Sequence, residues 1–575
     1  MSSPSKKTRR RKLLVRALLI AAAALLVLGV SGVAGYQVFA GWRARDLAAK
    51  AKENFEKENY RKAWLQINSA KELRPEEPDV LRVLGMIEGT MGRATALEYY
   101  DKLSRKADLT PEDLLSRAEI AMRFGDDAQF AEAAEALEGS GQKAEAGKLR
   151  TARMMRQGDL DRAIIQARAA AETTGDAELV LAKLRLLVQR YAPEFRPGSP
   201  ASAEARAGMA EALELVDGLM ETPQREEVLA FALNELEPPP ETRARWVAAA
   251  MENVQASNPA LLPAAALVVR SGEKTPAAMH ALLRPVFDAA PLDRRASYAL
   301  WLTGVGLPKE ALTLVTAQEA SESTAAFGAL TEALFAAGNL EAVLAAVEAG
   351  GNVDADIRLA AKARAEYERG RGPQGGAAAL REALSAAAQS RRLELLAASG
   401  DGLGASSVVD AQLAELCGDP SVADYVFRVA RDRFSRRGRP SLLQTAFGRA
   451  RDASPQSPAV RDYARYLELM ANNEVSPEET AAAVAAEPGN TAFRVTHALN
   501  LLRRSQPGEA LAVFEDTTVF ADRVTPGQLA VIAAVLSANG DEARARVAAG
   551  SINPDLLSSG EYELIVPLRF GASSR

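Results

Sequence analysis

The sequence has very little of the residue types that build most catalytic and metal sites. It contains one cysteine, Cys417, and two histidines, His280 and His497, among 575 residues. A single cysteine excludes an internal disulfide bond and any metal site built from several thiolates. No HExxH, GxSxG or Walker-type motif is present. We therefore predict that the protein is not an enzyme, and we expect no cofactor and no metal.

Aromatic residues and excess charge are also scarce. Phe, Trp and Tyr together make up only 5% of the chain, whereas β-sandwiches and barrels favour aromatic and β-branched strands. No segment alternates apolar and polar residues for long enough to predict a sheet. The formal net charge of −5 argues against non-specific nucleic-acid binding, which requires a basic surface. Alanine is abundant instead, which favours closely packed helices.

The N-terminal region combines a basic tail with a long uncharged run. Lysine and arginine are concentrated in residues 1–16, and residues 17–42 contain no charged side chain. At about 1.5 Å per residue, a helix of this length reaches across the roughly 30 Å core of a bilayer. Because positive charges stay on the cytoplasmic side, we expect the tail in the cytoplasm and the bulk of the chain outside it. The predicted location is the inner (cytoplasmic) membrane of a bacterium, crossed once.

A cleaved signal peptide is the alternative interpretation of the same run. Small residues that suit a cleavage site occur at 29–35 and again at 38–40. The apolar part of a signal peptide usually spans only about 7–15 residues, so the longer run here favours an uncleaved anchor. Both interpretations export the rest of the chain to the extracytoplasmic or periplasmic side.

Beyond residue 42 the chain repeats a helix–turn–helix pattern. Ala63, Ile67 and Ala70 are spaced for one face of a helix, and Pro75 follows where that helix should end. This unit resembles the tetratricopeptide repeat (TPR), a helical hairpin of about 34 residues in which small and apolar residues recur at these spacings before a proline. The resemblance implies an all-α, TPR-like α-solenoid, a right-handed superhelix of helix hairpins.

Further units follow in the same register. Leu84 and Gly85 match the leucine–glycine pair of the family's first helix, where glycine lets two helices approach. Ala163 lies about three repeat lengths after Ala63, and Phe447 and Phe514 mark units near the C-terminus. The resemblance is strongest over residues 45–105 and 424–525, and it weakens in the middle of the chain.

Proline and glycine clusters indicate where the array is interrupted. They occur at residues 192–201, 238–240 and 400–407. We therefore expect six regions: a basic cytoplasmic tail (1–16), a transmembrane helix (17–42), an N-terminal TPR sub-array (43–194), a degenerate helical-repeat middle (195–405), a C-terminal TPR sub-array (406–550) and a C-terminal cap (551–575).

The candidate functional surface follows from the resemblance. In TPR proteins the first helix of each repeat lines a concave groove in which partner peptides or helices dock. The family's register carries eight positions of this sequence into such a groove: Arg45, Lys52, Phe55, Arg82, Met86, Tyr425, Arg428 and Asp432.

One local motif resembles a nucleotide-binding loop. Residues 370–375 satisfy GxGxxG, a pattern that binds pyrophosphate when it follows a strand and opens a helix. Here the preceding segment has helical periodicity, so we predict a turn between helices instead.

These features favour a membrane-tethered extracytoplasmic scaffold that mediates protein–protein interactions in the assembly of an envelope complex, such as a secretion, polysaccharide-export or cell-wall-growth apparatus. The alternative is the α-superhelical platform of a wall-cleaving enzyme of the lytic transglycosylase type. The repeat pattern continues to about residue 547 and leaves no room for the catalytic domain of such an enzyme. A carbohydrate-binding solenoid would need more exposed Trp and Tyr.

Overall fold

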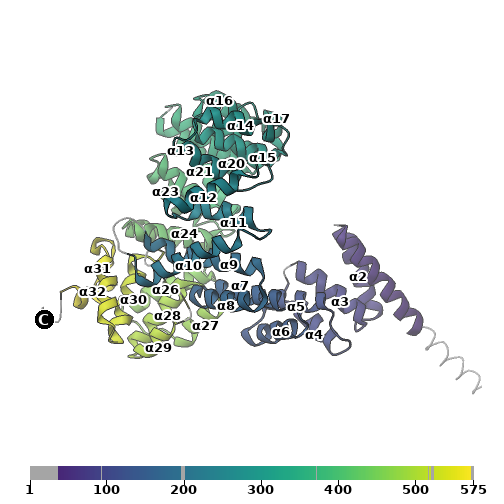
Figure 1. Ribbon diagram of the computed structural model, residues 1–575. Coiled ribbons are helices and arrows are strands. Elements are labelled where there is room, and N and C mark those ends of the chain that lie inside the picture. Colours follow the sequence, from purple (N-terminus) through teal and green to yellow (C-terminus); the bar gives the residue numbers. More distant parts are fainter. Residues whose placement is uncertain are drawn as a thin grey trace, which may run out of the picture. The chain divides into compact units, whose positions relative to one another are not determined.

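A computed structural model describes residues 37–570, apart from 58, 92, 196–200, 371, 516, 518 and 520–522. The described part is built from helices, and none of its residues lies in a β-strand. The predicted all-α architecture is thus confirmed for this part (Figure 1). The chain forms two compact units: Met1–Arg153 with Gln166–Leu179, and Met154–Ile165 with Val180–Arg575.

The first unit begins with a helix over residues 37–56. The helices after it are α2 (Tyr60–Leu73), α3 (Pro78–Thr90), α4 (Thr95–Ser104), α5 (Pro111–Phe124) and α6 (Asp127–Gly139). Three further helices contain residues of both units: α7 (Lys143–Gln157), α8 (Leu160–Thr174) and α9 (Ala177–Tyr191).

Local sequence signals explain where these helices begin and end. At the start of α5, the Asp113 backbone N–H donates to Thr110 Oγ1 (3.2 Å) and the Thr110 N–H donates to Asp113 Oδ2 (3.0 Å). This capping box satisfies two amides that the helix itself cannot pair. α2 ends at Leu73, two residues before the predicted proline stop at Pro75.

The core of the first unit confirms the predicted repeat face. Ala63, Ile67 and Ala70 are fully buried and pack against alanines of the helix over 37–56 and against α3. A Cβ atom on Gly85 would come within 2.9 Å of Tyr100 Cε2 on α4. Glycine at this position therefore lets α3 and α4 pack closely, as the leucine–glycine pair predicts.

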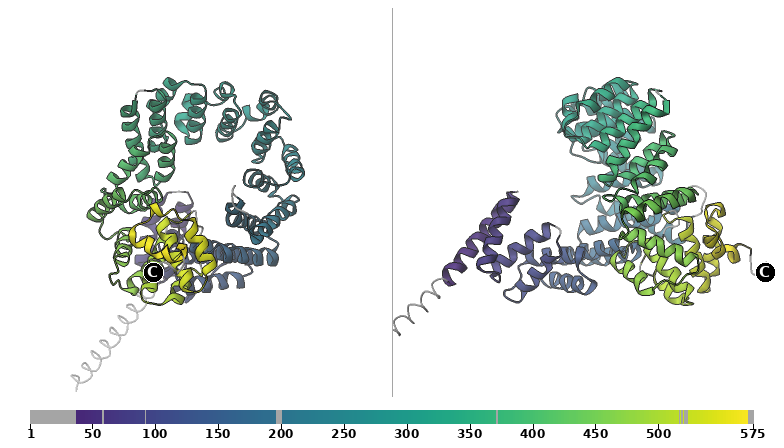
Figure 2. Two further views of the ribbon diagram at one scale, coloured as in Figure 1. Left: turned by 90° about the vertical axis from the view of Figure 1, so that its left-hand side faces the viewer. Right: turned by 180° about the vertical axis from the view of Figure 1, so that it is seen from behind.

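The second unit continues with hairpins (Figure 2). Its first part contains η1 (Ala192–Phe195), α10 (Ala203–Leu219), α11 (Arg225–Glu235), α12 (Pro240–Met251), α13 (Leu261–Arg270), α14 (Pro276–Asp288), α15 (Leu292–Gly304), α16 (Pro308–Ala311), α17 (Ala317–Glu322), α18 (Thr324–Ala336), α19 (Leu340–Ala349), α20 (Ala355–Glu368), α21 (Gly372–Gln389) and α22 (Leu393–Gly402).

Its second part contains α23 (Ser406–Leu416), α24 (Ala423–Arg436), α25 (Pro440–Ala453), α26 (Pro458–Met470), α27 (Pro477–Ala486), α28 (Thr491–Arg503), α29 (Pro507–Ala512), α30 (Pro526–Ala538), α31 (Glu542–Ser551), η2 (Pro554–Leu556) and α32 (Ser559–Phe570).

The apolar core of this unit is elongated. One cluster of buried side chains runs from Leu261 to Ala365, and the next runs from Ala363 to Val460. Two smaller clusters extend the core from Tyr466 to Leu568. The second cluster passes through residue 405, where we expected a sub-array to end; the predicted boundaries of the sub-arrays remain predictions.

Two sequence predictions concern the ends and the turns of the chain. No helix within the described residues is both long and apolar enough to cross a membrane. Residues 1–36 fall outside those residues, so the predicted tail and most of the predicted span at 17–42 do too.

The segment before the GxGxxG motif is the helix α20 rather than a strand, and α21 begins at Gly372. This agrees with a turn between helices.

Candidate partner-binding groove

The four hairpins from α24 to α31 build the candidate site. Their first helices, α24, α26, α28 and α30, pack against one another in order. Each contacts the second helix of its own or a neighbouring hairpin through an apolar face. On α26 this face includes Val460, Tyr466 and Leu469, all of which are buried.

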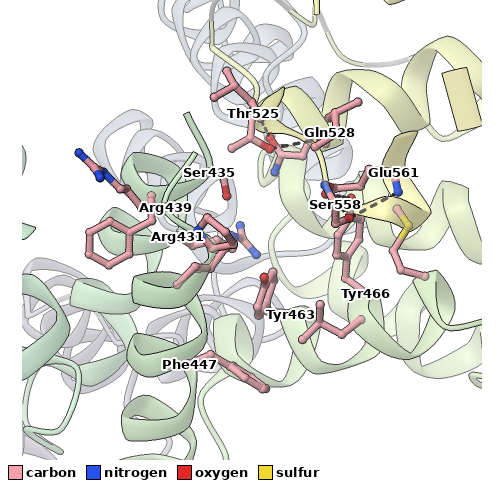
Figure 3. A pocket seen from close by; sticks show the side chains of 18 of the residues that line it. Arg431, Ser435, Arg439, Phe447, Tyr463, Tyr466, Thr525, Gln528, Ser558 and Glu561 are labelled. Atoms are coloured by element: carbon pink, nitrogen blue, oxygen red, sulfur yellow. Dashed lines mark hydrogen bonds between the residues drawn. The ribbon is translucent and has the colours of Figure 1, made fainter. Parts of the chain in front are cut away.

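A cavity of about 390 Å³ opens between these first helices (Figure 3). One wall is aromatic: the rings of Phe447 and Tyr463 meet edge to face at 5.3 Å between centroids, and Tyr463 stacks on Tyr466 at 6.2 Å. The cavity is also lined by α28, by the start of α30, by residues 555–558 and by Glu561. Aromatic walls with a few polar groups are typical of sites that bind apolar side chains of a partner.

A buried ion pair lies beside the cavity. Arg431 Nη1 donates to Asp462 Oδ2 at 3.2 Å, and the Asp462 side chain is only 3% exposed. Burial raises the pKa of Asp462 from its ordinary value of 3.8 to about 6, and the Arg431 charge opposes that rise. Arg431 is thereby held toward α26, so its charge is partly neutralised within the protein.

Four polar side chains of the cavity have no partner in the part of the chain that the structure describes. The side chains of Ser435, Arg439, Gln444 and Tyr463 line the cavity and make no hydrogen bond or ion pair to any described residue. Together they offer hydroxyl groups, an amide and a guanidinium, which suit the carbonyls and carboxylates of a peptide.

The arginines around the C-terminal end of α24 show how unusual Arg439 is. Arg433 donates to both carboxylate oxygens of Asp401 at 2.7 Å and to Asp410 at 2.6 Å. The hydrogen bonds from Arg433, together with the contacts from Ser406 and Arg437, hold the pKa of Asp401 at about 2. Arg431, Arg436 and Arg437 also have carboxylate partners. Among the described residues, Arg439 alone in this run pairs with no carboxylate.

The three predicted groove residues of the C-terminal array lie on α24, the helix that also contributes Arg431 and Ser435 to the cavity. Arg428 donates to both oxygens of Glu487 at 2.7 and 2.8 Å and to Asp424 at 3.0 Å, and its guanidinium lies over the Phe493 ring. The Tyr425 hydroxyl accepts the Leu393 backbone N–H at 3.1 Å. Tyr425 and Arg428 line a second hollow of about 610 Å³ rather than the aromatic cavity.

Asp432, the third of them, accepts a hydrogen bond from Arg436 at 2.9 Å. All three side chains therefore have partners inside the protein. Their role in binding stays a prediction. The aromatic cavity is instead lined by positions shifted along α24, including Arg431 and Ser435.

The predicted groove residues of the first unit also have neighbours inside the protein. Arg45 lies 3.4 Å from a Glu77 carboxylate oxygen, and Lys52 lies 3.9 Å from one of Glu56. Both side chains are more than half exposed, so these ion pairs hold them weakly. Phe55 is half-buried and meets Tyr60 edge to face.

Arg82 and Met86 follow on α3. Arg82 donates to Asp113 at 2.8 Å and to Asp79 at 3.1 Å, which ties α3 to α5. Met86 is half-buried against the apolar core. Arg82 thus has a structural contact, and the use of any of these residues for binding remains a prediction.

The cysteine is buried, and each of the two histidines has a polar neighbour within hydrogen-bond distance. Cys417 is fully buried, and burial raises the pKa of its thiol to about 12. His280 Nδ1 lies 2.7 Å from the Tyr298 hydroxyl, and His497 Nδ1 lies 2.9 Å from Thr480 Oγ1. Within the ranges that the structure covers, no three His, Cys, Asp or Glu side chains are grouped to hold a metal ion.

Sequence reasoning missed the most distinctive parts of the site. Tyr463 and Tyr466 are aromatic residues on a first helix, so their positions carried a signal that could have been used. Leu556 and Glu561 carried none, because they reach the cavity only when the end of the chain folds back.

Comparisons with known proteins give no family assignment. No family model matches the chain, and no curated protein matches it. Among solved structures, the chain is similar to the structure of Naa15/Naa10 bound to HypK-THB. The two share 13% sequence identity with a TM-score of 0.22, and the match covers 92% of this chain and 94% of that chain. It is also similar to yeast Tom70, with 15% identity and a TM-score of 0.21, covering 87% and 96%. Similarity this weak assigns neither a family nor an activity.

Proposed function

We propose that this protein is a scaffold whose C-terminal helical hairpins bind a segment of a protein partner. The observation that carries the proposal is the cavity between α24 and α30, which combines an aromatic wall with polar side chains that have no partner among the described residues. An apolar pocket with a few convergent polar groups is the usual form of a binding site. A stack of hairpins also presents a long surface on which several partners can bind.

We further propose that the scaffold is tethered to the inner membrane of a bacterium by residues 17–42, with its N-terminus in the cytoplasm. The support is the basic tail followed by the long uncharged run in the sequence. In this arrangement the hairpins lie outside the cytoplasm and bring together components of an envelope complex for secretion, polysaccharide export or wall growth. A reporter fused at residue 300 tests the topology, because activity in the cytoplasm would contradict it.

The binding role is tested by site-specific cross-linking in intact cells. A photoreactive residue at Gln444, in the cavity, should give a discrete cross-linked partner. The same residue at Arg461, which is exposed on α26 and does not line the cavity, is the matched control. In a Tyr463→Ala background the adduct at 444 should fall at least fivefold. Equal adducts at 444 and 461, or none at 444, would argue against the groove as a binding site.

A further inference from the structure

The end of the chain folds back onto the candidate groove. After α31, the chain turns through η2 and enters α32. Ile565 and Leu568 of α32 are buried in a core shared with α30 and α31. This contact anchors the helix, while residues 555–558 and Glu561, before and at its start, line the aromatic cavity (Figure 3).

Three close contacts seat this segment. The Leu556 side chain packs against Gly438, where a Cβ atom would come within 2.8 Å of Leu556 Cδ2. The Tyr466 hydroxyl donates to Glu561 Oε1 at 2.7 Å. Gly560 lies against the Met470 backbone, with the carbonyl oxygen 3.1 Å from where a Cβ atom would be. The segment therefore brings two leucines, Leu556 and Leu557, and two acidic residues, Asp555 and Glu561, to the lining of the groove.

The groove retains polar capacity that this segment does not use. Arg439 and Asp555 both line the cavity, yet no ion pair joins them, and neither side chain has another partner among the described residues. Gln444 and the Tyr463 hydroxyl likewise have no hydrogen-bond partner within the described ranges. Arg439 is exposed, and a guanidinium without a carboxylate partner at a cavity that also has an aromatic wall favours an acidic ligand with an apolar side chain.

We propose that the groove recognises an acidic, leucine-bearing peptide segment, and that residues 555–561 are an internal ligand of the same chemistry that the partner displaces. The inference rests on the proposed binding function of this groove. A carboxylate of the partner pairs with Arg439, and its apolar side chain packs against Phe447 and Tyr463. Displacement requires the loss of the Leu556, Gly560 and Glu561 contacts, while Ile565 and Leu568, farther along α32, keep that helix attached to α30 and α31.

The test uses the full-length protein and a fluorescent peptide with the sequence of residues 553–563, NPDLLSSGEYE. Fluorescence anisotropy should show weak binding to the wild-type protein, because the internal segment occupies the groove. The double variant Leu556→Ala/Glu561→Gln should bind the peptide at least tenfold more tightly. A peptide with Asp and Glu replaced by Asn and Gln should lose most of that affinity.

Arg439 provides the decisive control, because its side chain is exposed and makes no hydrogen bond or ion pair with any residue that the structure describes. In the double-variant background, Arg439→Glu should weaken peptide binding at least tenfold, whereas the exposed Arg461→Glu should leave it unchanged. Thermal unfolding monitors whether each variant is folded. If the double variant melts early, Glu561→Gln alone replaces it, with a smaller gain in affinity expected.

Two results would overturn the inference: equal peptide affinity for the wild-type protein and the displaced variant, or equal effects of Arg439→Glu and Arg461→Glu. Failure of the binding function itself would appear separately. If residue 444 cross-links a partner but the peptide does not bind, the groove binds a different kind of segment. If neither occurs, both proposals fail.

Discussion

At the scale of single residues, Asp462 links the site to pH. Its carboxyl is buried beside the cavity, and its pKa rises from 3.8 to about 6 because burial disfavours the charged form. A raised pKa means that the folded protein holds the proton more tightly than the unfolded chain does. The contribution of the protonated Asp462 to the free energy of unfolding is therefore complete below pH 3.8, and it is lost as the pH rises through about 6.

We expect Asp462→Asn to remove this dependence. Urea denaturation measures the free energy of unfolding of both proteins at each pH. The value for the wild-type protein minus that for the variant should fall by about 3 kcal/mol between pH 4 and pH 7, because each pKa unit corresponds to roughly 1.4 kcal/mol. In the variant, Arg431 loses its carboxylate partner, which lowers the free energy of unfolding by the same amount at every pH. A parallel pair of curves would show that Asp462 does not titrate in this range.

Arg433 is the other residue whose removal should be costly. It joins Asp401, in the last turn of α22, to Asp410 on α23, and the Asp410 side chain is only 6% exposed. Arg433→Ala leaves that buried carboxylate without its partner, so we expect a loss of about 3–5 kcal/mol. Arg451→Ala, at an exposed ion pair, should cost less than about 1 kcal/mol. Thermal unfolding distinguishes the two, and similar shifts would contradict the buried network.

At the scale of elements, the hairpins depend on close contacts between helices. Ala63, Ile67 and Ala70 were predicted to form one helix face because their spacing is local to α2, and all three are buried. The close approach of two helices at Gly85 was predicted from the repeat pattern, and the structure shows that Tyr100 is the residue that meets it.

Gly85→Ala should therefore separate α3 from α4. The added methyl group would meet Tyr100, and overpacking of this kind costs about 1–3 kcal/mol. Gly328→Ala on α18 is the matched control, because no heavy atom lies within 4 Å of its Cβ position. There the higher helix propensity of alanine should stabilise the protein by about 0.5–1 kcal/mol. Melting temperatures that move in opposite directions would support the close contact, and a neutral Gly85→Ala would refute it.

At the scale of the whole molecule, the second unit needs a cover for its last hairpin. α32 supplies it by burying Ile565 completely in the core with α30 and α31. A stack of hairpins that ends without such a cover exposes apolar surface to solvent.

We expect Ile565→Asp to undock this cover. A charged side chain in the core should lower stability by about 3–5 kcal/mol and promote self-association through the exposed faces of α30 and α31. Glu563→Lys, on the exposed side of the same helix, should change neither property. Light scattering after size-exclusion chromatography, together with thermal unfolding, measures both effects. A monomeric Ile565→Asp protein of normal stability would mean that α32 is dispensable.

The sequence by itself determined the helices, the faces they bury and the absence of a recognisable catalytic or metal motif. These depend on spacings within one or two helices, where propensity, capping and the repeat pattern act locally. Only the tertiary structure decided that Tyr425 and Arg428 line one hollow while Tyr463 and Tyr466 line another. It also decided that Glu561 reaches Tyr466, 95 residues earlier in the chain. Such contacts depend on the accumulated rotation of several hairpins, which no local spacing encodes.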